Sequence, residues 1–162
     1  QAPTYKLMIA DYDGMNPTPI LVTNQPVMSP AWSRDGQQIA YVSFESGLPA
    51  IYISNVYSGK RRLITDSSGI NSAPAFSPDG KRVASLERNH AVLIKYTDSD
   101  GSPPQRYLVP HGEKVGLAFC LGGKAILLRD ETSGRSGKMK TLGGIFLLTL
   151  DDSKVETLLQ IK

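Results

Sequence analysis

The chain has 162 residues, of which 40% are hydrophobic and 20% charged, and its formal net charge is +3. These values are typical of one globular domain and exclude a disordered or strongly acidic chain. No apolar run approaches the roughly 18 residues that a membrane helix needs, so we expect a protein that does not span a membrane. Residues 1–10 lack a basic segment followed by a long apolar core, so no signal peptide is visible.

Short apolar runs separated by Gly, Asp, Asn and Pro turns follow one another along the chain and predict β-strands. In chain order the expected strands are 5–10, 19–23, 29–33, 38–44, 50–55, 62–65, 73–77, 82–86, 91–97, 105–109, 115–120, 124–129, 144–150 and 155–160. The alternation in 38–44 predicts one face with Ile39, Tyr41 and Ser43 and another with Ala40, Val42 and Phe44.

One pattern recurs along the chain: an aromatic residue, a tight turn and then an apolar strand. Its aromatic residues, Trp32, Phe76 and Phe119, are 44 and 43 residues apart. A period of about 40–45 residues with this composition is typical of β-propeller blades. We therefore predict an all-β partial propeller of three four-stranded blades plus half a blade. If the ring of Trp32 lies buried between blades, its replacement by alanine should cost ~3–5 kcal/mol.

The repeat also predicts how this single propeller domain is divided. The half blade is expected at 1–26 and the blades at 27–66, 70–110 and 113–162, the last with a basic inserted loop at 130–143. This loop is expected to be a solvated segment or, as the alternative, a partner contact. An incomplete ring leaves strand edges open, so self-association through these edges, or a longer parent protein, is also expected.

The turns and basic clusters are predicted to be structural. Asp35-Gly36 and Asp79-Gly80 are typical tight-turn pairs, because Asp bonds to nearby backbone and Gly adopts a positive φ. Lys60-Arg61-Arg62 and Lys81-Arg82 stand beside turns without interleaved aromatic residues. They are therefore interpreted as solvated loop faces, and no nucleic-acid partner is predicted.

No catalytic motif is present in the sequence. The two histidines, His90 and His111, accompany no G-x-S-x-G, H-E-x-x-H, C-x-x-C or phosphate-binding loop. The run Asp98-Ser99-Asp100-Gly101 begins like a calcium loop, but Val109 stands where the closing glutamate belongs. Cys120 is expected to be a buried structural thiol. We predict a non-enzymatic protein without cofactor or metal.

Several motifs taken together indicate a family more specifically than the repeat alone does. Asp11-Tyr12-Asp13-Gly14, Ser29-Pro30-Ala31-Trp32 and Phe44-Glu45-Ser46-Gly47, in this order, closely resemble the start of the propeller of the TolB family, which is built from WD40-like (PD40) repeats. Ala73-Pro74-Ala75-Phe76-Ser77-Pro78-Asp79-Gly80-Lys81 extends the resemblance, which covers about residues 5–87. It implies a periplasmic interaction scaffold of the Tol–Pal system that serves cell-envelope integrity, cell division and colicin uptake. Its implied partners are a Pal-like lipoprotein, other Tol components and colicin-type peptides.

The channel mouth of the propeller is the expected binding site. There the connections from the outermost strand of one blade to the innermost strand of the next, and the first residues of each innermost strand, converge at 27–30, 70–73 and 113–116. By resemblance the partner-binding residues are Met28, Ser29, Ile70, Asn71, Ser72 and Ala73. In the third repeat, Lys114 and Val115 occupy the equivalent positions. An alternative stays open: an accessory propeller of a prolyl-oligopeptidase-like serine peptidase, which would control access to a separate hydrolase domain.

Overall fold

The computed structural model describes residues 3–65, 71–88, 91–98, 102–109, 113–131 and 143–160. Within these ranges the chain is β-structure with one short 3-10 turn, η1 (Leu121–Gly123), so the all-β prediction is confirmed. The strands are β1 (Tyr5–Ile9), β2 (Thr18–Thr23), β3 (Val27–Trp32), β4 (Gln38–Ser43), β5 (Ala50–Asn55), β6 (Arg61–Leu63), β7 (Asn71–Phe76), β8 (Arg82–Glu87), β9 (Ala91–Tyr96), β10 (Gln105–Leu108), β11 (Glu113–Cys120), β12 (Ala125–Glu131), β13 (Gly144–Thr149) and β14 (Val155–Gln160).

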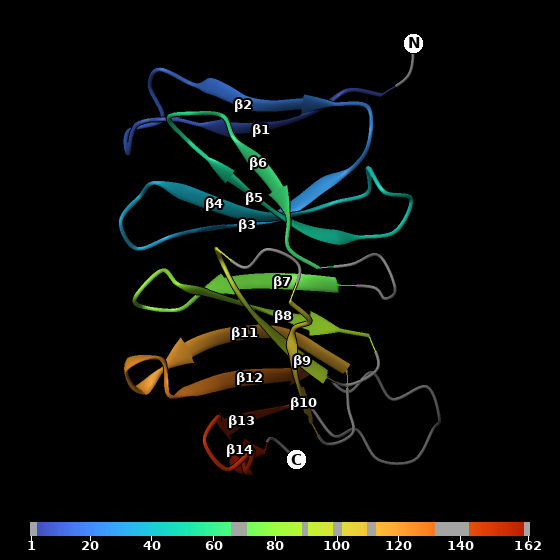
Figure 1. Ribbon diagram of the computed structural model, residues 1–162, viewed down its shortest axis with the longest axis vertical. Helices are drawn as coiled ribbons and strands as arrows, with labels where there is room; N and C mark the ends of the chain where they lie inside the picture. Colours follow the sequence, from blue (N-terminus) through green and yellow to red (C-terminus); the bar gives the residue numbers. More distant parts are fainter. Residues whose placement is uncertain are drawn as a thin grey trace.

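The strands form separate antiparallel sheets that succeed one another along the long axis of the molecule (Figure 1). β1 and β2 make a two-stranded sheet, and three four-stranded sheets follow with the orders β3-β4-β5-β6, β7-β8-β9-β10 and β11-β12-β13-β14. The first strands β3, β7 and β11 are neighbours from sheet to sheet. This arrangement of four-stranded meanders around a common inner side is that of propeller blades, and it confirms the predicted fold class.

The inner strands are longer at their start than the sequence indicated. β3, β7 and β11 each begin two residues before the expected position. Pairing with the next strand continues on both sides of a bulge in each inner strand, so an irregular residue interrupts the ladder without ending the strand. β12 extends to Glu131, so Asp130 and Glu131 of the expected loop 130–143 are strand residues. Residues 132–142 of that loop lie outside the described residues.

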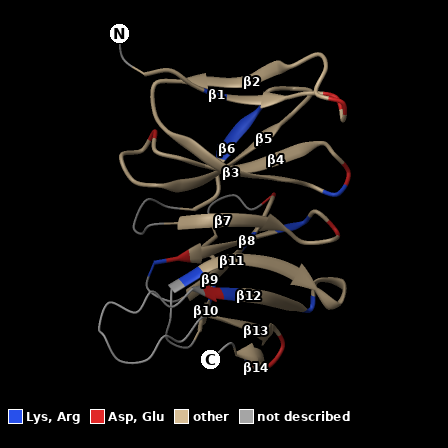
Figure 2. Ribbon diagram, turned by 180° about the vertical axis from the view of Figure 1, so that it is seen from behind, with Lys and Arg blue, Asp and Glu red and all other residues tan. Residues whose placement is uncertain are grey.

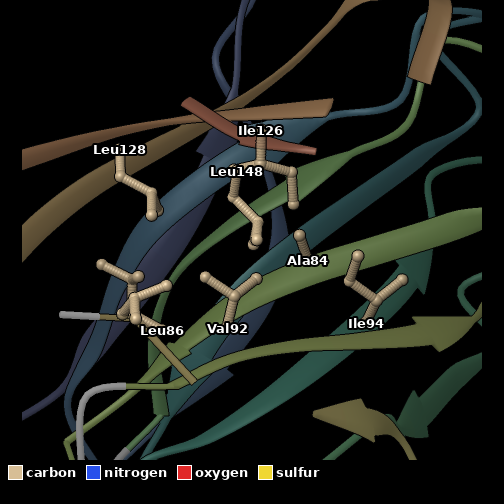
Figure 3. Close-up of a cluster of buried hydrophobic side chains, with 8 residues drawn as sticks. Ala84, Leu86, Val92, Ile94, Ile126, Leu128 and Leu148 are labelled. Atoms are coloured by element: carbon tan, nitrogen blue, oxygen red, sulfur yellow. The ribbon is translucent and has the colours of Figure 1, made fainter. Parts of the chain in front are cut away.

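Alternate residues of β4 pack against the two neighbouring sheets. Ile39 and Tyr41 of β4 pack with Leu7 of the two-stranded sheet, whereas Ala40 and Val42 pack with Val83 of the following blade. The alternation predicted for 38–44 is therefore confirmed. The last two blades share the largest cluster: Figure 3 shows Ile126, Leu128 and Leu148 of the last sheet opposite side chains of β8 and β9. The apolar faces between blades form the core and hold successive blades together.

The three repeated aromatic residues are structurally equivalent but not equally buried. Trp32, Phe76 and Phe119 pair with the second residue of the next strand, namely Ile39, Val83 and Ile126. Phe76 and Phe119 pack against the core of the preceding blade. Trp32 is 52% exposed, because the sheet before β3 consists, in the described residues, of β1 and β2 alone. The condition under which Trp32→Ala was expected to cost ~3–5 kcal/mol, a ring buried between blades, is therefore not met.

The tight turns after β3 and β7 are closed by the same side-chain lock. The Ser33 hydroxyl donates to Asp35 Oδ1 at 2.6 Å and accepts from the Gln38 N–H at 2.9 Å. Ser77 and Asp79 repeat this arrangement in the next blade. The structural role predicted for both Asp-Gly pairs is confirmed.

The turn after β11 has lost both members of that lock, because Cys120 and Gly122 stand at the Ser and Asp positions. A contact between blades takes its place. Arg82 donates to the Gly123 carbonyl at 2.9 Å, and its guanidinium carbon lies 5.5 Å from the centre of the Phe119 ring. Gly123 has φ +89°, and a Cβ there would lie 2.9 Å from the Arg82 side chain. Arg82 is thus an interblade contact and not part of a solvated loop face, which corrects the sequence interpretation.

Cys120 also differs from expectation. Its thiol is half-buried instead of buried, and burial raises its pKa above the ordinary value. The reason for the partial exposure is its place at the last residue of β11, where the strand enters the turn. The thiol is therefore held in its protonated, weakly nucleophilic form.

The turn locks predict an acid-dependent loss of stability. The Ser77 hydroxyl and then the Lys81 N–H lower the pKa of Asp79 below its ordinary value of 3.8, and Ser33 and Gln37 do the same for Asp35. A carboxylate with a lowered folded pKa stabilises the fold above the unfolded pKa, and this contribution is lost as the pH falls through the folded pKa. The Asp35→Asn/Asp79→Asn variant should therefore lose less stability than the wild type when urea unfolding is followed from about pH 5 down to about pH 2.

Ser77→Ala provides the control for this prediction, because it removes the main hydroxyl donor and keeps the Asp79 carboxylate. It should flatten the pH dependence partly. Identical slopes for all variants would show that these turn carboxylates do not contribute to acid stability.

Candidate functional site

One end of the stacked sheets gathers the starts of the inner strands and the ends of the second strands. The first pairs of the three ladders are Val27–Ser43 in one blade, Asn71–Glu87 in the next and Glu113–Glu131 in the last, where Lys114–Asp130 is the second pair. Because β3, β7 and β11 are neighbours, these pairs lie at one edge, which we call the rim. In the second sheet the turns between β3 and β4 and between β5 and β6 lie at the opposite end.

The rim residues of two blades have an unusual backbone. Ser29 and Ala73 have φ of 53° and 48°, and each precedes a proline. In both strands the register shifts at this point, so that two residues oppose one on the next strand. A non-glycine residue in the left-handed region before proline is strained, and such strain often occurs where a protein binds a partner. In β11 the register shifts at Val115 instead. No described residue of β11 has a positive φ, and the next residue with one is Leu121 in the following turn.

The structure brings together five of the six sequence-predicted site residues, on the neighbouring strands β3 and β7. Met28 is 47% exposed and Ser29 is exposed. Asn71 is buried, and its N–H donates to the Pro49 carbonyl of the preceding blade at 3.2 Å. Ser72 and Ala73 are half-buried, and Ile70 lies outside the described residues. Met28 and Ser29 are therefore the members that present side chains to solvent.

Each complete blade also carries an acidic residue near the rim with a basic partner, which the sequence reasoning missed. Glu45 binds Arg61 of β6 at 2.9 Å, and Glu87 binds Arg106 of β10 at 2.8 Å, so both partners come from outermost strands. In the last blade the partner of Asp130 is Lys114, from the innermost strand. The only sequence signal was a charged residue at each strand end. The charges alone do not say which strand supplies the partner.

The Lys114–Asp130 pair is the one that is deeply buried. Lys114 Nζ lies 3.2 Å from Asp130 Oδ2, and the two side chains are 4% and 6% exposed. The ammonium group also lies 4.8 Å from the centre of the Phe146 ring. Asp130 Oδ1 is buried and accepts no hydrogen bond from the residues that the structure describes. An ion pair in such a site depends strongly on both partners, because each charge alone would be left without water. Figure 2 shows the adjacent charged segments of β11 and β12.

The described ranges of the chain contain neither a metal-ligand cluster nor a membrane-spanning helix. No group of three or more His, Cys, Asp or Glu residues within these ranges could hold a metal ion. His90, His111 and most of the calcium-like run, residues 99–101, lie outside the described residues. None of the described helical segments is long and apolar enough to cross a membrane.

Comparisons with known proteins agree with this architecture. A family model described as "TolB beta propeller domain" (PD40) matches residues 1–158. The Tol-Pal system protein TolB of Alcanivorax borkumensis is 53% identical over 81 residues, which is 49% of this chain and 19% of that protein. TolB of Methylococcus capsulatus is 55% identical over 69 residues, which is 43% of this chain and 16% of that protein. This chain thus spans less than a fifth of either relative.

A solved structure extends the similarity beyond those segments. The crystal structure of TolB from Acinetobacter baumannii has a TM-score of 0.76 and 33% sequence identity, and it covers 95% of this chain and 37% of the A. baumannii chain. The superposition therefore includes the last blade, where the turn lock and the bulge differ from those of the other blades. With the family model matching almost the whole length, this chain belongs to the TolB β-propeller (PD40) family.

Proposed function

We propose that this chain is a non-enzymatic protein–protein interaction scaffold of the Tol–Pal system, acting in the periplasm and docking a Pal-type lipoprotein at the rim. Membership of the TolB propeller family and the relatives named Tol-Pal system protein TolB support this proposal. They favour it over an accessory propeller of a serine peptidase. Other Tol components and colicin-type peptides would use the same surface.

One structural observation supports particular residues as the binding surface. Two neighbouring inner strands present the same strained bulge at the rim, with Ser29 and Ala73 in the left-handed region. A bulge removes backbone groups from the sheet ladder and turns side chains aside, which leaves polar backbone for an extended partner segment. Met28 lies beside the first bulge with nearly half of its surface exposed. It is suited to be the apolar anchor of the contact.

We expect Met28→Asp to weaken binding of a Pal-type lipoprotein by about tenfold or more, which is about 1.4 kcal/mol or more. A carboxylate in a desolvated contact loses its water without gaining a partner. The measurement is a calorimetric titration of the chain with the lipoprotein domain, after circular dichroism has shown that the variant is folded.

Met15→Asp is the matched control. Met15 is 62% exposed and lies in the turn between β1 and β2, at the end of the sheets opposite the rim. Its replacement should leave affinity within about twofold of the wild type. Equal losses for both variants would remove the rim from the proposal, and no binding by the wild-type chain would contradict Pal docking by this chain.

A further inference from the structure

We propose that the outer corner of the second sheet, far from the rim, binds a phosphate-type oxyanion between Lys60 and Arg62. A pocket of about 320 Å³ opens there. It is lined by Gln38, Ile53, Asn55, Ser58, Lys60, Arg61 and Arg62. The proposal is independent of the Tol–Pal function and adds a small-anion site to the scaffold.

The sheet register explains how these residues meet. Gln38 of β4 pairs with Asn55 of β5, and Ile53 pairs with Arg62 of β6. Paired residues, and residues two apart on one strand, share a face of the sheet. Gln38, Ile53, Asn55 and Arg62 therefore lie on one face, with the buried Ile53 as the floor. Lys60 and Ser58 join them from the β5–β6 turn.

The side-chain oxygen of Asn55, an acceptor in this pocket, is already used by the neighbouring turn. Asn55 Oδ1 accepts from the N–H groups of Tyr57 and Ser58 and from the Ser58 hydroxyl. The Asn55 side chain is thereby fixed with its amide N–H₂ directed away from the turn. With the Gln38 amide, the Lys60 ammonium and the Arg62 guanidinium, it forms a set of donors suited to an anion with several acceptor oxygens.

The charge of the pocket is also uncompensated. Arg61 is committed elsewhere: its Nε donates to the Tyr41 hydroxyl at 2.6 Å and its Nη2 binds Glu45. Lys60 and Arg62 make no ion pair within the part of the chain that the structure describes, and no carboxylate lines the pocket. The two free positive charges match the charge of about −1.5 to −2 on a phosphate monoester near neutral pH. Figure 2 shows the basic strand β6 without an acidic neighbour on the same strand.

The other blades do not repeat this set. In the third sheet Arg82 stands at the position of Gln38 but reaches the Gly123 carbonyl, and Tyr96 replaces Asn55. In the last sheet Ala125 and Thr149 occupy the two positions. The donors are therefore a feature of one blade and not of the repeat, so the blade architecture does not require them.

The site is tested by following backbone amide NMR signals while inorganic phosphate is added at constant ionic strength and neutral pH. We expect saturable shifts at Gln38, Asn55 and Ser58 with millimolar affinity, and no saturation with acetate. Lys60→Gln/Arg62→Gln should weaken binding about tenfold or more. Arg34→Gln/Lys81→Gln removes the same charge from exposed turn residues and should bind like the wild type.

The outcomes separate specific binding from a general charge effect. Absence of saturation in the wild type, or an equal loss in the control variant, would overturn the proposal. A second arm distinguishes the source of the phosphate by sedimentation with phosphatidylglycerol or phosphatidylcholine vesicles. Binding to phosphatidylglycerol alone, lost in Lys60→Gln/Arg62→Gln and displaced by phosphate, identifies a lipid headgroup as the source. Saturable phosphate binding without vesicle binding identifies a soluble phosphate compound.

Discussion

Asp130→Ala is expected to lower the free energy of unfolding by about 3–5 kcal/mol, because it removes the carboxylate that lies 3.2 Å from the buried Lys114 ammonium. The Phe146 ring, 4.8 Å away, replaces only part of the lost attraction. Urea unfolding followed by circular dichroism measures the change, and it should be the largest effect among the charged residues of the rim.

Two further variants identify the cause of that loss. Lys114→Met/Asp130→Leu removes both charges and should recover most of the stability, since apolar replacements of a buried pair are often close to neutral. Arg106→Ala breaks the pair with Glu87, whose side chains are 45% and 16% exposed, and should cost about 1 kcal/mol or less. A double variant as unstable as Asp130→Ala would show that packing at β11 and β12, and not the loss of the ion pair, accounts for the effect.

Phe76→Ala is expected to cost about 3 kcal/mol, because the ring packs against Ala40, Val42 and neighbouring residues of the preceding blade. Trp32→Ala should cost about 1 kcal/mol or less, although Trp32 has the same register position and a larger ring. Half of the Trp32 surface is already in water, so its removal leaves little cavity. Thermal unfolding of the two variants beside the wild type measures the difference.

The order of these two costs is the informative result. A larger loss for Trp32→Ala than for Phe76→Ala would mean that the Trp32 ring is covered in solution, for example by the open-edge self-association that the sequence suggests. Sedimentation of the wild type and of Trp32→Ala at several concentrations then separates the two explanations, because only an association interface makes stability depend on concentration.

The candidate site was predicted less completely than the fold. The rim positions of Met28, Ser29 and Asn71–Ala73 follow from repeat spacing and family resemblance, and the structure places them on neighbouring strands. Their different exposure could not be predicted, because it depends on the preceding blade: the Pro49 carbonyl holds the Asn71 backbone, whereas Met28 borders the two-stranded sheet. The positive φ before Pro30 and Pro74 was not predicted either, since a residue before proline normally favours extended backbone.

The sequence by itself determined the local features of this protein. The period between Trp32, Phe76 and Phe119, the alternation along β4 and the Asp-Gly turns each depend on residues close together in the chain, so their physics can be read from it. The tertiary structure alone decided the exposure of Trp32, the burial of the Lys114–Asp130 pair and the contact of Arg82 with Gly123. These features depend on which strand or blade lies opposite, and residues far apart in the chain meet there only after folding, when burial sets the strength of each contact.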